Sequence, residues 1–308
     1  MKKFFALILA ALFFMTPAQA QTTYTVDDEE VASDLAGAPA EKIYASLPQA
    51  TGEYKSRLRP ILIEGAMNTE TEVLVRALKN PVAYRELNYL FVAGTYKGYP
   101  VVVVRTEQGL ANAAVSTALA IKKFNPVAVI NQGTSGGTTP ALKIGDIVIG
   151  DKAIPTSAFK SGYSPKGAGV DFRAQKMRGT YAFDAATETF KPHSEYPADP
   201  TLFNVAFAVA NEHEDFNAVS GTIGSADWWM CWVDYTDMLN KRYGMLCEEM
   251  ETVAAAQICH NAGVPFIGIR ILSDNITIGQ EYDPAIAATC QNFVLLVTER
   301  YIRTVLNK

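Results

Sequence analysis

The chain has 308 residues, 49% of them hydrophobic, so it is long enough for one large domain with an extensive core. Its formal net charge of −5 at pH 7 argues against a nucleic-acid-binding protein, which needs clustered Lys and Arg to attract phosphates. Three His, and four Cys without a CxxC spacing, predict no metal site, no cofactor and no catalytic triad. The spacing of Cys231 and Cys247 leaves a disulfide between them open.

The first twenty residues have the features of a secretory signal peptide. Lys2 and Lys3 precede an apolar run over residues 4–15, and Ala18-Gln19-Ala20 is a small-x-small cleavage site. The run is too short to span a bilayer; an uncleaved anchor or a buried helix is the alternative. We therefore expect cleavage after Ala20 and a periplasmic or secreted mature protein without membrane attachment.

The rest of the chain predicts an extension followed by one domain of alternating strands and helices. Residues 21–56 are polar and are expected to lie outside the main core, whereas the domain covers 57–308. The hydrophobic patterns predict strands at 61–65, 89–93, 101–104, 127–130, 218–223, 245–247 and 266–272. They predict helices at 69–79, with a capping box of Thr69 and Glu72, and at 110–124, 202–211, 250–261 and 285–306.

Residues 151–200 interrupt this alternation with scattered Gly and Pro, and we expect a variable insertion there, near an opening. Strands that alternate with helices imply a sheet covered on both faces. The expected fold is therefore an α/β three-layer sandwich around a mixed, mostly parallel central sheet.

Four polar segments follow predicted strands, where ligands bind in open α/β sheets. They are Gly65-Ala66-Met67-Asn68-Thr69-Glu70, Asn131-Gln132-Gly133-Thr134-Ser135-Gly136-Gly137, Glu248-Glu249-Met250-Glu251 and Arg270-Ile271-Leu272-Ser273-Asp274-Asn275. Each also has a purely structural explanation. The glycines suit a tight turn, Glu251 suits the positive end of a helix dipole, and Asp274 suits a helix N-cap. Their common position at strand ends predicts one pocket.

These four segments, with Ile144-Gly145-Asp146-Ile147-Val148 and Cys259-His260-Asn261, resemble the nucleoside phosphorylase superfamily. They are most similar to its hydrolytic branch, the methylthioadenosine/S-adenosylhomocysteine nucleosidases. The resemblance runs from about residue 61 to the C-terminus and is broken at 151–200. It implies the nucleoside phosphorylase type of fold, a homodimer, and hydrolysis of the N-glycosidic bond of purine nucleosides, of the adenine type such as methylthioadenosine.

The resemblance also implies roles for particular residues. Asp274 matches the acid that protonates the departing purine at N7, which requires a raised carboxyl pKa. Glu70 matches the residue that activates the attacking water, and Glu251 matches the carboxylate that holds the ribose hydroxyls. The other expected substrate contacts are Thr134 and Arg270 around the ribose and water, Gly133, Met250, Ser273, which orients Asp274, and Trp229 (or Trp228), which stacks on the base.

Two alternatives to hydrolysis stay open. Phosphorylases of this fold bind phosphate with a Gly-Asp-Pro-x-x-Arg type of loop and an Arg before the Gly-Ser turn. Asn68 and Asn131 follow neither pattern, so water is the expected nucleophile. An exported nucleoside-binding protein without activity is the other alternative, and retention of both Glu70 and Asp274 argues against it. Departures such as Thr134-Ser135 in the glycine-rich turn leave the preferred nucleoside open.

Overall fold

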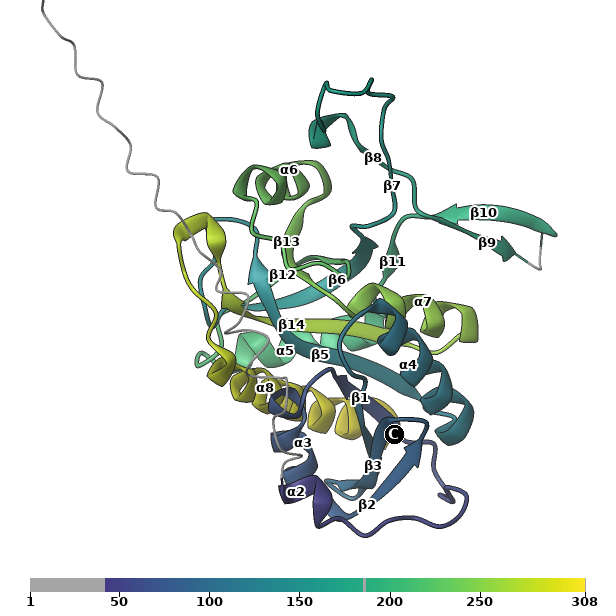
Figure 1. Cartoon of the computed structure of the whole chain (residues 1–308). Coiled ribbons are helices and arrows are strands. Elements are labelled where there is room, and N and C mark those ends of the chain that lie inside the picture. Colours follow the sequence, from purple (N-terminus) through teal and green to yellow (C-terminus); the bar gives the residue numbers. More distant parts are fainter. Residues whose placement is uncertain (1–41, 185–186, 308) are drawn as a thin grey trace, which may run out of the picture. The chain divides into compact units, whose positions relative to one another are not determined.

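A ten-stranded mixed sheet runs through the domain and carries helices on both faces (Figure 1). The computed structural model describes residues 42–184 and 187–307, so the expected signal peptide and residues 21–41 of the expected extension lie outside the described residues. The strands of this sheet are β1 (Ile61–Gly65), β2 (Lys79–Glu86), β3 (Tyr89–Tyr96), β4 (Tyr99–Arg105), β5 (Ala128–Gly137), β6 (Ile147–Pro155), β11 (Tyr196–Pro197), β12 (Ala218–Ser225), β13 (Met245–Glu249) and β14 (Phe266–Asp274).

The helices are α2 (Lys42–Ala45), α3 (Glu72–Ala77), α4 (Leu110–Phe124), α5 (Pro200–Glu212), α6 (Val233–Tyr243), α7 (Thr252–Ala262) and α8 (Ala287–Tyr301). Short 3₁₀ turns are η1 (Asn68–Glu70), η2 (Phe172–Ala174), η3 (Ile276–Ile278) and η4 (Pro284–Ile286), and a π-helical turn, η5 (Ile302–Leu306), continues α8. None of the helices in the described part of the chain is long and apolar enough to cross a membrane.

Five strands of the sheet close on themselves. β5 pairs with β14, β14 with β6, β6 with β12, β12 with β13, and β13 again with β5. We call this set the strand ring. The sheet has both parallel and antiparallel pairings, and the parallel ones are on average the longer, so the expectation of a mixed sheet is confirmed.

Two hydrophobic cores lie on opposite faces of the sheet, and successive residues of β1 show why. Ile61 and Ile63 belong to the core shared with α3, α5 and α8, whereas Leu62 belongs to the core shared with α4 and α7. All of β1 is buried, as expected for a strand with parallel neighbours and helices on both sides. The three-layer α/β sandwich predicted from the sequence is confirmed.

The predicted helix over 69–79 is wrong in extent. The chain forms η1 and then the six-residue α3, because Thr71 departs from helical geometry with a φ of −125°. The N-cap of α3 is Thr71, without a side-chain cap bond, so the predicted Thr69–Glu72 capping box is not formed. Beyond α3 the chain enters the unpredicted strand β2, where Pro81 disfavours continued helix.

Other predicted loops are parts of strands. β5 continues through the glycine-rich segment to Gly137, β13 includes Glu248 and Glu249, and β14 runs on through Asp274. Their polar side chains therefore stand on hydrogen-bonded backbone rather than on flexible turns. The helix α6 was also not predicted, because polar residues are frequent along it and only one side of the helix is buried.

The segment after residue 42 packs on the domain, which corrects the expectation that it lies outside the core. Tyr44 is 2% exposed, belongs to the core with α8, and its hydroxyl lies 2.6 Å from Thr71 Oγ1. Tyr54 meets the Phe124 ring edge-on, with ring centroids 4.9 Å apart.

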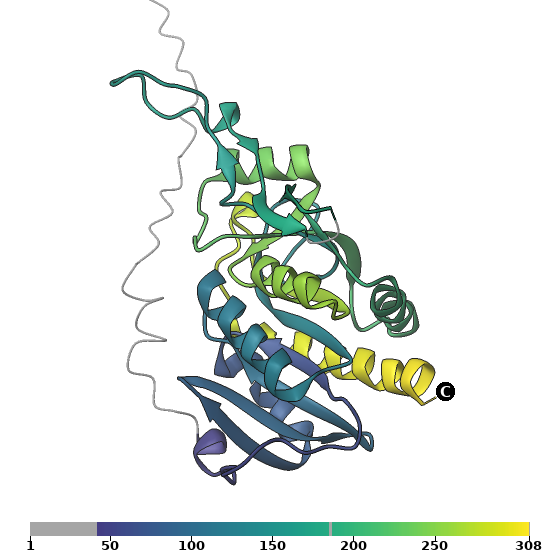
Figure 2. The same cartoon turned by 90° about the vertical axis from the view of Figure 1, so that its right-hand side faces the viewer.

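The expected insertion at 151–200 begins later than predicted, because β6 runs to Pro155 within the main sheet. It then forms two small antiparallel pairs, β7 (Phe159–Lys160) with β8 (Lys176–Met177), and β9 (Thr180–Asp184) with β10 (Thr189–His193). Figure 2 shows these pairs beyond the main sheet, and β11 then returns to β6. Cys247 is a buried thiol outside any disulfide, so the pairing with Cys231 left open by the sequence is not formed.

Candidate functional site

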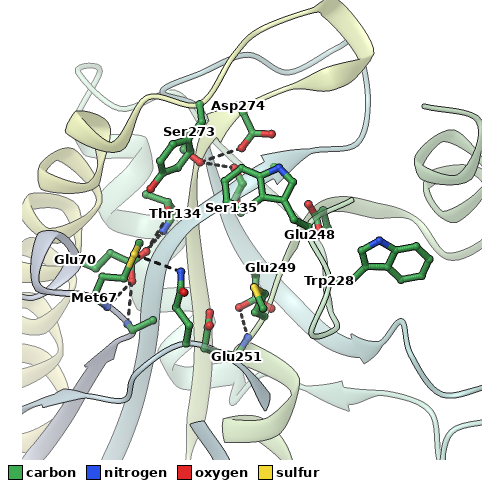
Figure 3. Close-up of a pocket in the computed structure, with 16 residues that line it drawn as sticks. Met67, Glu70, Thr134, Ser135, Trp228, Glu248, Glu249, Glu251, Ser273 and Asp274 are labelled. Atoms are coloured by element: carbon green, nitrogen blue, oxygen red, sulfur yellow. Dashed lines mark hydrogen bonds between the residues drawn. The ribbon is translucent and has the colours of Figure 1, made fainter. Parts of the chain in front are cut away.

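A cavity of about 510 Å³ opens where β5, β13 and β14 end, beside η1 and the start of α7 (Figure 3). Seven of the residues predicted for the site line it, namely Glu70, Thr134, Trp229, Met250, Glu251, Ser273 and Asp274. The four predicted segments thus meet in one pocket.

Glu70 is held by four donors. Its Oε2 accepts from the amides of Ala66 and Met67 at 2.9 and 3.2 Å, and its Oε1 accepts from the amide and hydroxyl of Thr134 at 2.7 and 2.9 Å. The side chain is 2% exposed, yet it lines the cavity. This carboxyl is therefore fixed in one orientation at the pocket wall, together with the Thr134 hydroxyl.

Glu251 lies where α4 and α7 begin. Its Oε1 accepts from the amide of Gly109 at 2.9 Å, just before the first turn of α4. Gly109 has a φ of +97°, a conformation that favours glycine. Burial first, and the neighbouring charge of Glu249 second, raise the pKa of Glu251. Glu251 is the N-cap residue of α7 but makes no side-chain cap bond, because the carboxyl that accepts from the amides of Glu251 and Thr252 belongs to Glu249.

Arg270 lies behind the pocket wall and not on it, which corrects its predicted place around the ribose. It is 1% exposed, and its Nη2 donates to Glu249 Oε2 and to Asn131 Oδ1, both at 2.5 Å. The distance from Nη2 to Glu251 Oε2 is 3.8 Å. Burial acts to lower the pKa of Arg270, but Glu249 and Glu251 more than offset it, so the pKa is raised.

Gly133 is also behind the wall. A methyl group at this position would lie 2.6 Å from Glu70 Oε1 and would collide with the Arg270 guanidinium. The glycine therefore allows Arg270 and Glu70 to approach each other. Its predicted contact with the substrate stays a prediction.

Asp274 has few hydrogen-bond partners. Oδ1 lies 3.2 Å from the hydroxyl of Ser273, which is also 3.2 Å from the carbonyl oxygen of Ser135. Burial raises the pKa of Asp274 to about 6, and the Ser273 bond opposes this. Asp274 is not a helix cap, since the cap of η3 is Asn275, which accepts from the Thr277 amide. The carboxyl is thus available to a ligand and is poised near neutral pH.

Both candidate aromatic residues border the cavity. Trp229 is 39% exposed and meets the ring of Tyr282 edge-on, with centroids 5.4 Å apart. Trp228 stacks on Tyr235 with centroids 5.5 Å apart, so it is anchored in the cluster around α6. Trp229 and Tyr282 form the exposed aromatic rim, and Trp228 forms the wall behind it.

Sequence reasoning assigned no role to Glu248, Glu249 or Tyr282, all of which line the cavity. Glu249 binds Arg270 and caps α7, as described above. A signal for Glu249 exists in the alternation along β13, whose burial pattern puts Met245, Cys247 and Glu249 on the buried side. Nothing local in the sequence distinguishes Glu248.

The charges around the cavity are of one sign. Five carboxyl groups line it, those of Glu70, Glu248, Glu249, Glu251 and Asp274, and none of the described lining residues is Lys, Arg or His. The nearby Arg105 is bound to Glu107 and to Asn68 Oδ1, each at 2.9 Å. Within residues 42–184 and 187–307 no group of three or more His, Cys, Asp or Glu has an arrangement that would hold a metal ion.

The mixed sheet with its strand ring, and the carboxyl-lined pocket where three strands end, are the features to compare with known proteins. Sequence comparison identifies the family. The chain belongs to the phosphorylase superfamily, whose sequence profile matches residues 60–303. Over 214 residues it is 33% identical to a 5'-methylthioadenosine/S-adenosylhomocysteine nucleosidase of Shewanella frigidimarina, covering 69% of this chain and 85% of that relative.

Solved structures show the same fold. The 5'-methylthioadenosine/S-adenosylhomocysteine nucleosidase of Neisseria meningitidis, in complex with methylthio-immucillin-A, is 27% identical, with a TM-score of 0.64 over 79% of this chain and 99% of its own. The nucleosidase of that name from Colwellia psychrerythraea, in complex with adenine, is 25% identical, with a TM-score of 0.63 over 80% and 97%. The superfamily and fold implied by the sequence motifs are thus confirmed.

Proposed function

We propose that this protein hydrolyses the N-glycosidic bond of purine nucleosides, with water as the nucleophile. The observation that carries the proposal is the composition of the pocket wall, where five carboxyl groups and no Lys, Arg or His line the cavity in the part of the chain that the structure describes. A phosphate dianion needs Arg or Lys partners and would be repelled here. A neutral water is not repelled, and a ribose that gains positive charge is stabilised by surrounding carboxylates.

The arrangement of the carboxyls supports a different role for each of them in the reaction. Cleavage breaks the bond between ribose C1′ and the base nitrogen, and the bonding electrons leave with the base. Asp274, whose pKa is raised to about 6, gives its proton to purine N7. A water held by Glu70 and Thr134 adds to C1′ and loses its proton to Glu70, while Glu251 accepts hydrogen bonds from the ribose hydroxyls.

Figure 3 is consistent with these roles, because Ser273 and Asp274 lie at one end of the pocket and Glu70 and Glu251 lie towards the other. A nucleoside placed with its base at Asp274 has its ribose at Glu70 and Glu251. We infer that Trp229 stacks on the base from the rim. Adenine-type nucleosides such as methylthioadenosine are the proposed substrates, in keeping with the names of the relatives.

The test is incubation of the purified protein with methylthioadenosine, adenosine and inosine in buffer with and without phosphate. We expect free base and free ribose, or 5-methylthioribose, at the same rate in both buffers. Product that forms only with phosphate, as a ribose 1-phosphate, would establish a phosphorylase instead. Tight purine binding without turnover of any nucleoside would establish a binding protein.

We also propose, from the first twenty residues and from the family, that the protein is exported, is cleaved after Ala20 and works as a homodimer. N-terminal sequencing of the protein from its native cells should begin at Gln21. An intact Met1 would contradict export, and a monomer mass in light scattering would contradict the dimer.

A further inference from the structure

A second carboxyl faces Asp274 in the pocket. Gly136 on β5 pairs with Glu248 on β13 on one side and with Asp274 on β14 on the other. A methyl group at Gly136 would lie 3.0 Å from Glu248 Oε1 and 3.1 Å from Asp274 Oδ2. Both carboxyls therefore lie on the side of Gly136 where a side chain would stand.

This arrangement follows from the strand ring. β5 has β13 on one side and β14 on the other, and residues in register with the same partner present their side chains on the same face. Gly136 has no side chain to keep them apart. Two carboxylates that lie on the same side of one residue repel each other, which favours retention of one proton by the pair.

The surroundings favour retention of that proton. Burial first, and then the charge of Asp274, raise the pKa of Glu248 well above its usual range. Glu249 and Glu251 add to this, and only the backbone amide of Met230 opposes it. The remaining ionisable neighbour is the buried thiol of Cys247, itself a weak acid whose pKa is raised by burial. No cation lines the described part of the cavity to neutralise the pair.

We propose that Glu248 is a positioning residue that holds, jointly with Asp274, the proton that the departing base takes up. The inference rests on the proposed hydrolysis, to which it adds the reason why the acid works at neutral and mildly alkaline pH. The proton passes from Asp274 to N7 of the base, the pair is left with two negative charges, and a proton from solvent restores it.

The experiment compares kcat/KM for methylthioadenosine between pH 5 and pH 9 in the wild type, Glu248→Gln and Glu248→Asp. Gln keeps the size of the side chain but cannot share a proton, whereas Asp restores a carboxyl. We expect Glu248→Gln to match the wild type within about twofold at pH 5 and to be at least about tenfold slower at pH 8, since a general acid loses about tenfold per pH unit above its pKa. Glu248→Asp should recover most of the alkaline activity.

A ratio of kcat/KM between the wild type and Glu248→Gln that stays constant from pH 5 to pH 9 would overturn the inference, because it would mean that Glu248 only packs or contacts the base.

A measurement that does not need turnover separates this outcome from failure of the proposed function. Carbon-13 NMR of protein labelled at the Asp carboxyls, with the Asp274 signal assigned by its loss in Asp274→Asn, should show two titration steps in the wild type and one in Glu248→Gln. One step in both proteins would refute the shared proton, even if hydrolysis is observed. Two steps in the wild type without nucleoside hydrolysis would refute the proposed function alone.

Discussion

Asp274 makes one side-chain hydrogen bond, to Ser273, and faces the cavity. We predict that Asp274→Asn lowers kcat by about a hundred- to ten-thousand-fold, because an amide still hydrogen-bonds a purine nitrogen but delivers no proton. Adenine affinity, measured by calorimetry, should change by less than about tenfold.

The matched control is Asp283→Asn, which removes the same charge from a carboxyl that only caps η4 through the Ala285 amide. Because Asn caps helices as well as Asp does, this variant should keep wild-type turnover and stability. Wild-type turnover in Asp274→Asn as well would remove Asp274 from the mechanism. A parallel fall in adenine affinity would show that the carboxyl acts in binding.

At the scale of elements, the start of α4 positions Glu251, where we propose that the ribose binds. The amide of Gly109 donates to Glu251, and a methyl group at Gly109 would lie 2.9 Å from Asp227 Oδ1. We predict that Gly109→Ala raises KM for the nucleoside at least about tenfold. The amide is kept, but the clash with Asp227 and the positive φ displace it from Glu251, and losing a hydrogen bond to a charged group costs about 1.5–3 kcal/mol.

Gly98→Ala is the control for backbone strain. Gly98 also has a positive φ, of 81°, but a methyl group there meets nothing within 4 Å. Both variants should lose a similar free energy of unfolding, about 1 kcal/mol, while Gly98→Ala keeps the wild-type KM. An unchanged KM in Gly109→Ala would show that α4 does not position Glu251.

The secondary-structure elements show which parts of the site and the fold can be predicted from the sequence. Glu70, Glu251 and Asp274 were identified because each follows a hydrophobic strand in a recognisable motif, and the structure brings all three to one pocket. Arg270 was misplaced because every residue of β14 is buried, so no alternation indicates towards which side a side chain points. The strand β2 was missed because it begins with exposed polar residues at the edge of the sheet.

The position of Glu248 opposite Asp274 could not be predicted from the sequence. Its relation to Asp274 depends on two strands that pair with Gly136 from opposite sides, although the two residues are 26 positions apart in the chain. Register between distant strands is set by the closed sheet as a whole, and no local pattern encodes it.

For the whole molecule, one buried carboxyl makes stability depend on pH. Glu64 on β1 is fully buried between helix α4 and strand β5, where it accepts from Thr117 Oγ1 at 2.9 Å and from Asn131 Nδ2 at 3.1 Å. Burial raises its pKa from 4.5 to about 7. Because the folded state holds this proton more tightly than the unfolded state, the contribution of Glu64 is complete below pH 4.5 and is lost as the pH rises through 7.

We predict that Glu64→Gln removes this part of the pH dependence. Relative to the wild type, the free energy of unfolding of the variant should increase by roughly 3 kcal/mol between pH 4.5 and pH 8, as measured by urea denaturation. Glu53→Gln, at an exposed position, should show no such trend. Parallel curves for the wild type and Glu64→Gln would mean that Glu64 is ionised throughout.

The strand ring has a consequence for local motion. β14 is hydrogen-bonded on both sides over Ile269–Ile271, to β5 and to β6, and each of these strands is joined through the ring to the other. This part of β14 cannot fray without breaking pairings on two sides. Amide protons in this part of β14 should therefore exchange with deuterated solvent only through cooperative opening, at rates set by the global free energy of unfolding. The stretch expected to exchange slowly thus ends three residues before Asp274, where β14 pairs with β5 alone.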